Sequence, residues 1–124
     1  MKKLLYFLPA ALFYLLIFTL SSRSLAVNIH VYQFDNVAHA IEFGIMALLL
    51  SFGFFHVLRA SLGIKTLLTF FFGLALGILD EFHQYYVPGR HSDILDALAD
   101  AVGIAGGIFI YWYLEKRKKA AAKP

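Results

Sequence analysis

The sequence contains no cysteine. Disulfide bonds, thiolate catalysis and cysteine-ligated zinc are therefore excluded. The chain of 124 residues also shows no internal repeat, no sign of a second domain and no low-complexity segment apart from a short Ala/Lys stretch near its C-terminus. Its length and uniform character predict one compact domain.

Charged residues are also scarce. Asp, Glu, Lys and Arg make up 15% of the sequence, and hydrophobic residues make up 60%. In a soluble domain about 25% of the residues are charged and about 45–50% are apolar. The mean hydropathy of +0.71 agrees with this balance, which predicts that the solvent is a lipid bilayer. The net charge of +3 does not indicate a nucleic-acid partner, because most Lys and Arg residues lie at the ends of apolar runs, where they act as topology signals.

Four long apolar runs predict four membrane-spanning helices. Such a helix needs about 20 mostly apolar residues, roughly 17–25. The first run has this length alone, and the other three reach it when a few polar residues are admitted at one end. We therefore predict an all-α, polytopic membrane protein with helices at about 4–20, 38–58, 65–86 and 94–114. They would form one domain, residues 1–115, followed by a basic tail, residues 116–124.

The first run has an alternative interpretation. Lys2 and Lys3, an apolar stretch and the sequence SLA at residues 24–26 resemble a cleavable secretion signal. The run of seventeen residues, 4–20, exceeds the usual apolar region of about 7–15 residues in such signals. We therefore expect the first helix to be retained.

The basic residues predict the orientation. If the N-terminus lies in the cytoplasm and the chain crosses four times, nine basic residues are cytoplasmic and only Arg23 and Arg90 lie on the far side. This excess is the positive-inside pattern. We predict a multi-pass protein of the plasma (inner) membrane with both termini in the cytoplasm. The basic tail, Lys116–Lys119, is expected to contact anionic lipid.

The acidic residues have the opposite distribution, with only Glu115 expected inside. Asp80 comes fifteen residues after Lys65, which is a helical rise of about 22 Å in a hydrocarbon core about 30 Å thick. Asp100 lies fifteen residues before Glu115, at a similar depth. Ionisable residues at such a depth normally face the bundle interior or a water-filled cavity, and they indicate a functional site.

Helical spacing places the outer polar residues on shared faces. Asp80 and Gln84 are four residues apart, and Asp96 precedes Asp100 by the same interval. Side chains three or four positions apart lie on one side of a helix. With Glu81 at the depth of Asp80, and Arg90 after the following turn, the candidate site residues are Asp35, His39, Glu42, Asp80, Glu81, Gln84, Arg90, Asp93, Asp96 and Asp100.

Small residues and a turn complete the expected pocket. Four-residue glycine spacing, which lets helices approach closely in lipid, occurs in the third and fourth helices at Gly73 and Gly77, and at Gly103 and Gly107. Pro88-Gly89 is a turn signal that would bring Arg90 back over the carboxylates. The last three helices are therefore predicted to pack at the glycines and open into a polar pocket at the outer end.

Three interpretations of this pocket are open. The first is a catalytic or metal site, because crowded carboxylates in a low dielectric share protons or bind a cation. Asp, Glu and His can also act as general acids and bases, and an Arg can hold phosphate or carboxylate. Asp, Glu and His suit a divalent ion such as Mg, Ca, Mn or Zn, which we place among His39, Glu42, Asp80 and Asp96. Their spacing matches no specific metal motif. A second interpretation is an ion- or proton-coupled binding or transport unit, which would need an oligomer. A third is a polar seam that serves helix packing or partner binding alone.

Two segments resemble the VanZ-like family of small bacterial membrane proteins. They are DNVAHAIEFG, residues 35–44, and LDEFHQYYVPGRHSDILDALADAVG, residues 79–103. The sequence LSSRS, residues 20–24, also fits. The motifs pair Asp-x-x-x-His-x-x-Glu on one helix with Asp-Glu-x-x-Gln and Pro-Gly-Arg on the next segment, and the resemblance extends over nearly the whole chain.

The resemblance implies a multi-helix membrane protein, and the name-giving member is associated with low-level resistance to the glycopeptide teicoplanin. Asn36 stands where the family often has Lys, and Asp100 where Asn is common, so this pocket is more acidic than the family pattern. The family's polar pattern otherwise falls on Pro88, Gly89 and the candidate residues named above. We therefore expect a cell-envelope protein that handles a lipid-linked or polar envelope ligand, with a divalent metal as the cofactor to consider.

Overall fold

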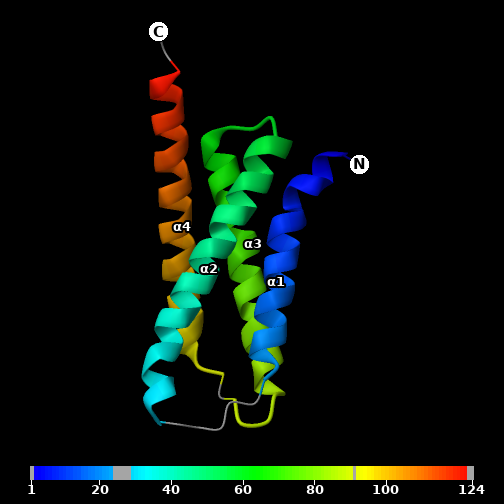
Figure 1. Cartoon of the computed structure of the whole chain (residues 1–124), viewed down its shortest axis with the longest axis vertical. Coiled ribbons are helices and arrows are strands. Elements are labelled where there is room, and N and C mark those ends of the chain that lie inside the picture. The colour runs from blue at the N-terminus through cyan, green and yellow to red at the C-terminus, as the bar shows by residue number, and fades with distance from the viewer. Residues whose placement is uncertain (1, 24–28, 91, 123–124) are drawn as a thin grey trace.

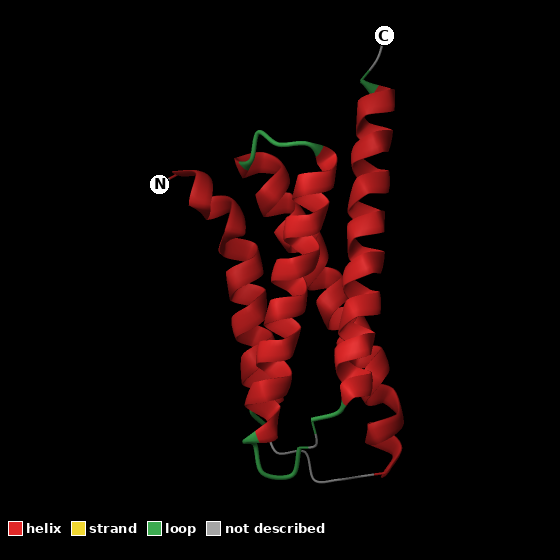
Figure 2. Cartoon of the chain, turned by 180° about the vertical axis from the view of Figure 1, so that it is seen from behind, coloured by secondary structure: helices red, strands yellow, loops and turns green. Residues whose placement is uncertain are grey.

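The computed structural model describes residues 2–23, 29–90 and 92–122. Within these ranges every regular element is helical, as Figure 2 shows. A short 3-10 helix η1 (Lys2–Phe7) leads into α1 (Leu8–Ser21), and α2 (Ile29–Val57), α3 (Leu62–Tyr85) and α4 (Ile94–Ala121) follow. The predicted all-α class is confirmed. The SLA sequence at residues 24–26 and Lys123 lie outside the described residues.

The four helices are those predicted, and two of their bounds differ from the prediction by seven residues or more. α2 begins at Ile29, nine residues before the expected start at 38, because hydropathy detects the apolar part of a helix and not its polar extension. α4 continues to Ala121, so the expected boundary at residue 115 does not end the helix. Ala, Lys and Arg are strong helix formers, and basic residues in a last turn are favoured by the helix dipole.

The helices form an up-and-down bundle (Figure 1). The α3–α4 turn and the facing ends of α1 and α2 lie at one end, and the chain termini and the α2–α3 connection lie at the other. We call these the acidic end and the basic end, after the residues gathered at each. Four spans of the described chain are long and apolar enough to cross a membrane: η1 together with α1 (Lys2–Ser21), Phe34–Val57 of α2, α3 and α4, with mean hydropathies of 2.1, 1.8, 2.0 and 1.7. The protein is therefore a multi-pass membrane protein.

Helices α2 and α4 make the closest contact in the bundle. A methyl group on Gly103 would collide with the carbonyl oxygen of Ala40, and one on Gly107 would collide with that of Gly44. The predicted role of the glycines is confirmed, since Gly73 of α3 also lies against α4. The matching small residues of α2, Ala40 and Gly44, were not predicted, although they too are four residues apart.

The apolar core fills the bundle between the acidic end and the basic end. It is built mainly by α2, and α4 adds Ile104. Helix α1 joins it through Ala10 and Ile17, which are both buried. Because α1 and α3 also place many large apolar side chains on the outside, such as Leu12 and Phe71, the bundle presents a lipid-compatible surface around a polar end.

Candidate functional site

His39 of α2 lies at the centre of the acidic end. Its side chain is buried, and its Nδ1 is 3.0 Å from Oδ1 of Asp100 on α4. The same nitrogen is 3.7 Å from Oε1 of Glu81 on α3. Gly77 makes room for this arrangement, since a Cβ there would lie 2.7 Å from Oδ2 of Asp100. One imidazole therefore links three helices.

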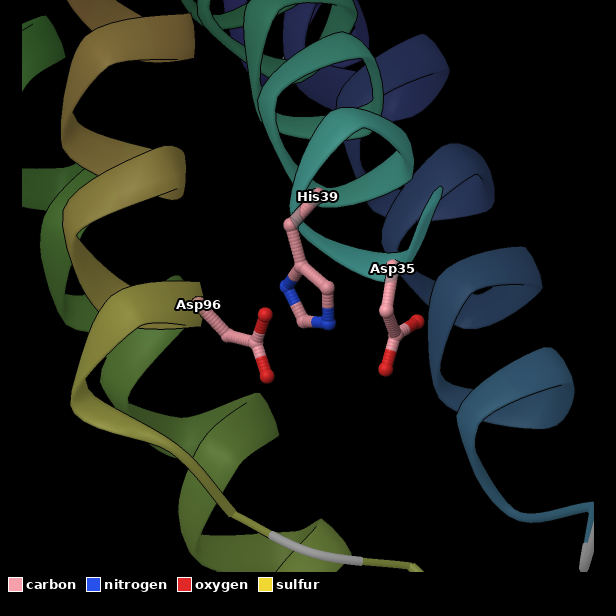
Figure 3. Close-up of side chains that lie close together, drawn as sticks. All are labelled: Asp35, His39 and Asp96. Carbon is pink, nitrogen blue, oxygen red and sulfur yellow. The ribbon is translucent and has the colours of Figure 1, made fainter. Parts of the chain in front are cut away.

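A second group shares His39. Asp35 precedes His39 by one turn of α2, and Asp96 precedes Asp100 by one turn of α4. The side chains of Asp35, His39 and Asp96 each offer a ligand atom within 4.8 Å of the other two. Figure 3 shows the His39 ring between the two carboxyl groups. His39, Glu81 and Asp100 also each offer a ligand atom within 4.8 Å of the other two, so two three-residue groups overlap at one histidine.

Asp80 belongs to a different set of contacts. Ser21 at the end of α1 donates a 2.8 Å hydrogen bond to Oδ1, and the Gln84 amide donates one of 2.7 Å to Oδ2. All three residues are buried. Ser21 was not among the predicted site residues, although it belongs to the LSSRS sequence. Through this contact α1 is part of the polar end.

The neighbouring Ser22 and His83 also tie α1 to α3. The Ser22 hydroxyl is 2.6 Å from the carbonyl oxygen of Phe18, to which it donates, and 2.8 Å from Nε2 of His83. Either the His83 ring N–H or the Ser22 hydroxyl can donate in this contact, according to the tautomer of His83.

The α3–α4 turn carries Arg90 back over the acids, as predicted. Gly89 has a φ of 82°, a left-handed conformation that favours glycine. The Arg90 backbone N–H donates to the carbonyl oxygen of Val87 at 3.1 Å. The guanidinium Nη1 then lies 3.7 Å from Oδ1 of Asp35.

The remaining predicted residues lie outside the two groups around His39. Asp93 caps α4 by accepting a 3.0 Å hydrogen bond from the Leu95 N–H. Glu42 is half-buried and belongs to neither three-residue group. Of the expected metal set, the structure brings His39 and Asp96 together but not Glu42 and Asp80, and Asp35 stands in their place.

Residues 2–115 match the family model described as VanZ/LLP1. The chain belongs to this family. No match was found among curated proteins or among solved structures. The matched range includes all ten candidate residues and Ser21, so the polar end is an integral part of the VanZ/LLP1 domain.

The VanZ/LLP1 domain leaves several polar atoms at this end unsatisfied. Among the described residues, the buried oxygens without a hydrogen-bond partner include both of Glu81, Oδ1 of Asp96 and Oδ2 of Asp100. A buried polar group without a partner costs about 1–3 kcal/mol, and more if it is charged. Native proteins keep few such groups. In the described part of the chain, these unsatisfied oxygens are concentrated around His39.

Proposed function

We propose that this VanZ/LLP1 protein binds a polar or lipid-linked ligand of the cell envelope at its acidic end and that His39 exchanges a proton with that ligand. The observation that carries the proposal is the buried His39, held at 3.0 Å by Asp100 and surrounded by three further carboxyl groups. Proton transfer by a positioned histidine is among the commonest devices of catalysis.

The His39–Asp100 pair gives the histidine a defined role. A carboxylate that accepts from Nδ1–H holds the ring in one tautomer and orientation. The second ring nitrogen, Nε2, can then accept or donate a proton. Glu81 lies within 3.7 Å of the same Nδ1 and adds negative charge that stabilises a protonated ring.

The depth and expected orientation of the site support an envelope ligand. The positive-inside pattern predicts that the acidic end faces the extracytoplasmic side. Asp100 is sixteen residues from Lys116 along α4, or about 24 Å, so the site lies below the far headgroup layer of a core about 30 Å thick. A ligand carried by a lipid can reach this depth from within the outer leaflet.

Transport by a single chain is less well supported. The buried core beyond the acidic end is apolar and includes Phe43, Met46 and Ile104. Within the described part of the chain, Ser51 and Thr69 are the buried polar residues of the basic half, and the Thr69 hydroxyl donates within its own helix to the Lys65 carbonyl oxygen. These residues do not form a continuous polar path.

Helix packing alone is also less well supported. Polar residues that hold helices together satisfy one another by hydrogen bonds, as Ser21, Asp80 and Gln84 do. The unsatisfied oxygens of Glu81 and Asp96 differ from that pattern. We therefore assign the structural role to the Asp80 contacts and the chemical role to the residues around His39.

A substitution pair on α2 tests the proposal. The full chain is expressed in a glycopeptide-sensitive host, and the change in teicoplanin susceptibility is measured together with the lipids that copurify with the protein. We expect His39→Gln to abolish the change in susceptibility and the copurification of lipids. His56→Gln, at the exposed basic end of the same helix, should leave both as in the wild type. Equal amounts of monodisperse protein must be recovered. A folded His39→Gln protein with wild-type susceptibility and lipids would contradict the proposal.

A further inference from the structure

Two overlapping groups of metal-ligating side chains occur at the acidic end, and the structure distinguishes between them. Each contains His39, with either Asp35 and Asp96 or Glu81 and Asp100. A histidine ring nitrogen binds a metal only when it carries no proton. Which nitrogen is engaged elsewhere therefore decides which group can hold an ion.

Nδ1 of His39 is the engaged nitrogen. It lies 3.0 Å from Oδ1 of Asp100, within hydrogen-bonding distance. Metal-binding histidines almost always donate their other ring N–H to a carboxylate, a carbonyl or water, which orients the ring and raises its basicity. Asp100 is positioned for this supporting role, which leaves Nε2 as the metal donor.

Asp35 and Asp96 are positioned as the other ligands. Their carboxyl groups lie on either side of the His39 ring (Figure 3). Asp96 is 3% exposed, and its Oδ1 has no hydrogen-bond partner among the described residues. This buried, unsatisfied oxygen is a second observation that points to a cation, independent of the clustering itself.

The charge and donor types define the ion. Two carboxylates and one neutral imidazole supply a charge of about −2, which a divalent cation balances. The imidazole favours first-row transition metals over Mg²⁺ or Ca²⁺. Three protein ligands also leave positions open for water or a substrate. Arg90, 3.7 Å from Asp35, offsets part of the remaining negative charge.

We infer that Asp35, His39 and Asp96 form a site for a divalent transition metal, such as Mn²⁺ or Zn²⁺, with Asp100 as the residue that positions His39. This inference rests on the proposed function for the location of the site and changes the role of His39, because Nε2 would hold the ion and the proton exchanged with the ligand would come from water on that ion. Metal binding itself is measured without reference to teicoplanin or lipid.

The test uses the full chain purified in detergent, stripped of metal with a chelator and dialysed against MnCl₂ or ZnCl₂. Bound metal per chain is measured by elemental analysis, and its affinity by titration calorimetry. We expect one ion per wild-type chain with at least one of the two metals. Asp96→Asn and His39→Gln should each abolish binding of the ion. Asp100→Asn should weaken binding roughly 10–100-fold, the usual effect of removing a residue that hydrogen-bonds to a metal-binding histidine.

Two matched variants make the assignment specific. Asp80→Asn removes a buried carboxylate that is already satisfied by Ser21 and Gln84, and it should keep the ion. Glu81→Gln removes a ligand atom of the other group, and it should also keep the ion. Loss in Glu81→Gln with retention in Asp35→Asn would overturn the assignment, and so would a wild-type chain that binds neither metal.

The two proposals fail in distinguishable ways. In the first case, the wild-type chain binds one ion, but the Asp96→Asn variant gives the same teicoplanin susceptibility and copurified lipids as the wild type. That result would support the metal site and oppose its part in the proposed function. In the second case, the wild-type chain binds no metal, but His39→Gln still abolishes the changes in teicoplanin susceptibility and copurified lipids. That result would overturn the metal site and still support proton transfer by His39.

Discussion

The two ends of the bundle use ionisable residues in different ways. At the basic end, cations lie over aromatic rings near the surface, with Lys65 Nζ 5.0 Å from the Phe55 centroid and Lys116 Nζ 5.1 Å from that of Trp112. At the acidic end, carboxyl groups are buried between helices and meet at His39. Lipid headgroups and water can satisfy the basic side chains. The acidic side chains depend on one another and on whatever occupies the site, so substitutions should be tolerated far better at the basic end.

Site-specific labelling gives the largest expected contrast between the ends. Because the chain has no native cysteine, Ser92→Cys at the acidic end and Ala120→Cys at the basic end can each be labelled without background. With the predicted orientation, a membrane-impermeant maleimide should label Ser92→Cys in intact cells and Ala120→Cys only after lysis. The reverse pattern would show that the acidic end faces the cytoplasm.

A methyl group between α2 and α4 should have the next largest effect. Gly103→Ala would bring Cβ against the backbone of Ala40, which cannot rotate away. Overpacking typically costs about 1–3 kcal/mol, and we expect about 3 kcal/mol here, measured as the loss of free energy of unfolding in mixed micelles. Gly106→Ala is the control, because nothing lies within 4 Å of its Cβ position. If both variants unfold alike, close packing does not hold the acidic end in place.

Removing single carboxylates should separate paired from unpaired acids. Asp100→Asn weakens the contact with His39, and we expect a loss of about 1.5–3 kcal/mol of stability, the range for a hydrogen bond to a charged group. Glu81→Gln removes a charge from oxygens without a hydrogen-bond partner within the described ranges, and metal-free protein should become equally or more stable. Thermal unfolding of the chelator-treated proteins measures both. Similar losses in the two variants would mean that Glu81 is already satisfied.

The smallest effect is expected at the basic end. Lys116→Gln removes a cation that is exposed and stacked on Trp112. Surface substitutions usually change stability by no more than about 0.5 kcal/mol, and we expect that limit to hold in the same unfolding assay. A loss comparable to that of Asp100→Asn would remove the contrast between the two ends.

The class of fold and the location of the polar end were predictable because they depend on composition along the chain. Apolar runs predicted four helices, and helical spacing placed His39, Asp96 and Asp100 on faces that do meet. The Pro88-Gly89 signal correctly predicted that Arg90 returns over the acids. These features require no knowledge of how each helix is rotated about its axis.

The pairing of individual side chains was not predictable, because it depends on how each helix is rotated about its axis. Asp80 was expected with His39, but it is satisfied by Ser21 of α1 and by Gln84. On helices that are apolar nearly all round, the sequence pattern only weakly defines which face turns inward. The contact of Ala40 and Gly44 with α4 was missed, although their four-residue spacing is the same small-residue signal for close helix packing in lipid.

The unbroken length of α4 relates the site to the thickness of the bilayer. Asp100 and Lys116 lie sixteen residues apart on one helix, a separation of about 24 Å. With Lys116 held in one headgroup layer, a bilayer a few Å thinner would bring Asp96 and Asp100 closer to water, and a thicker one would bury them further, at constant tilt. The hydration of the carboxylates is therefore a property that the surrounding lipid helps to set.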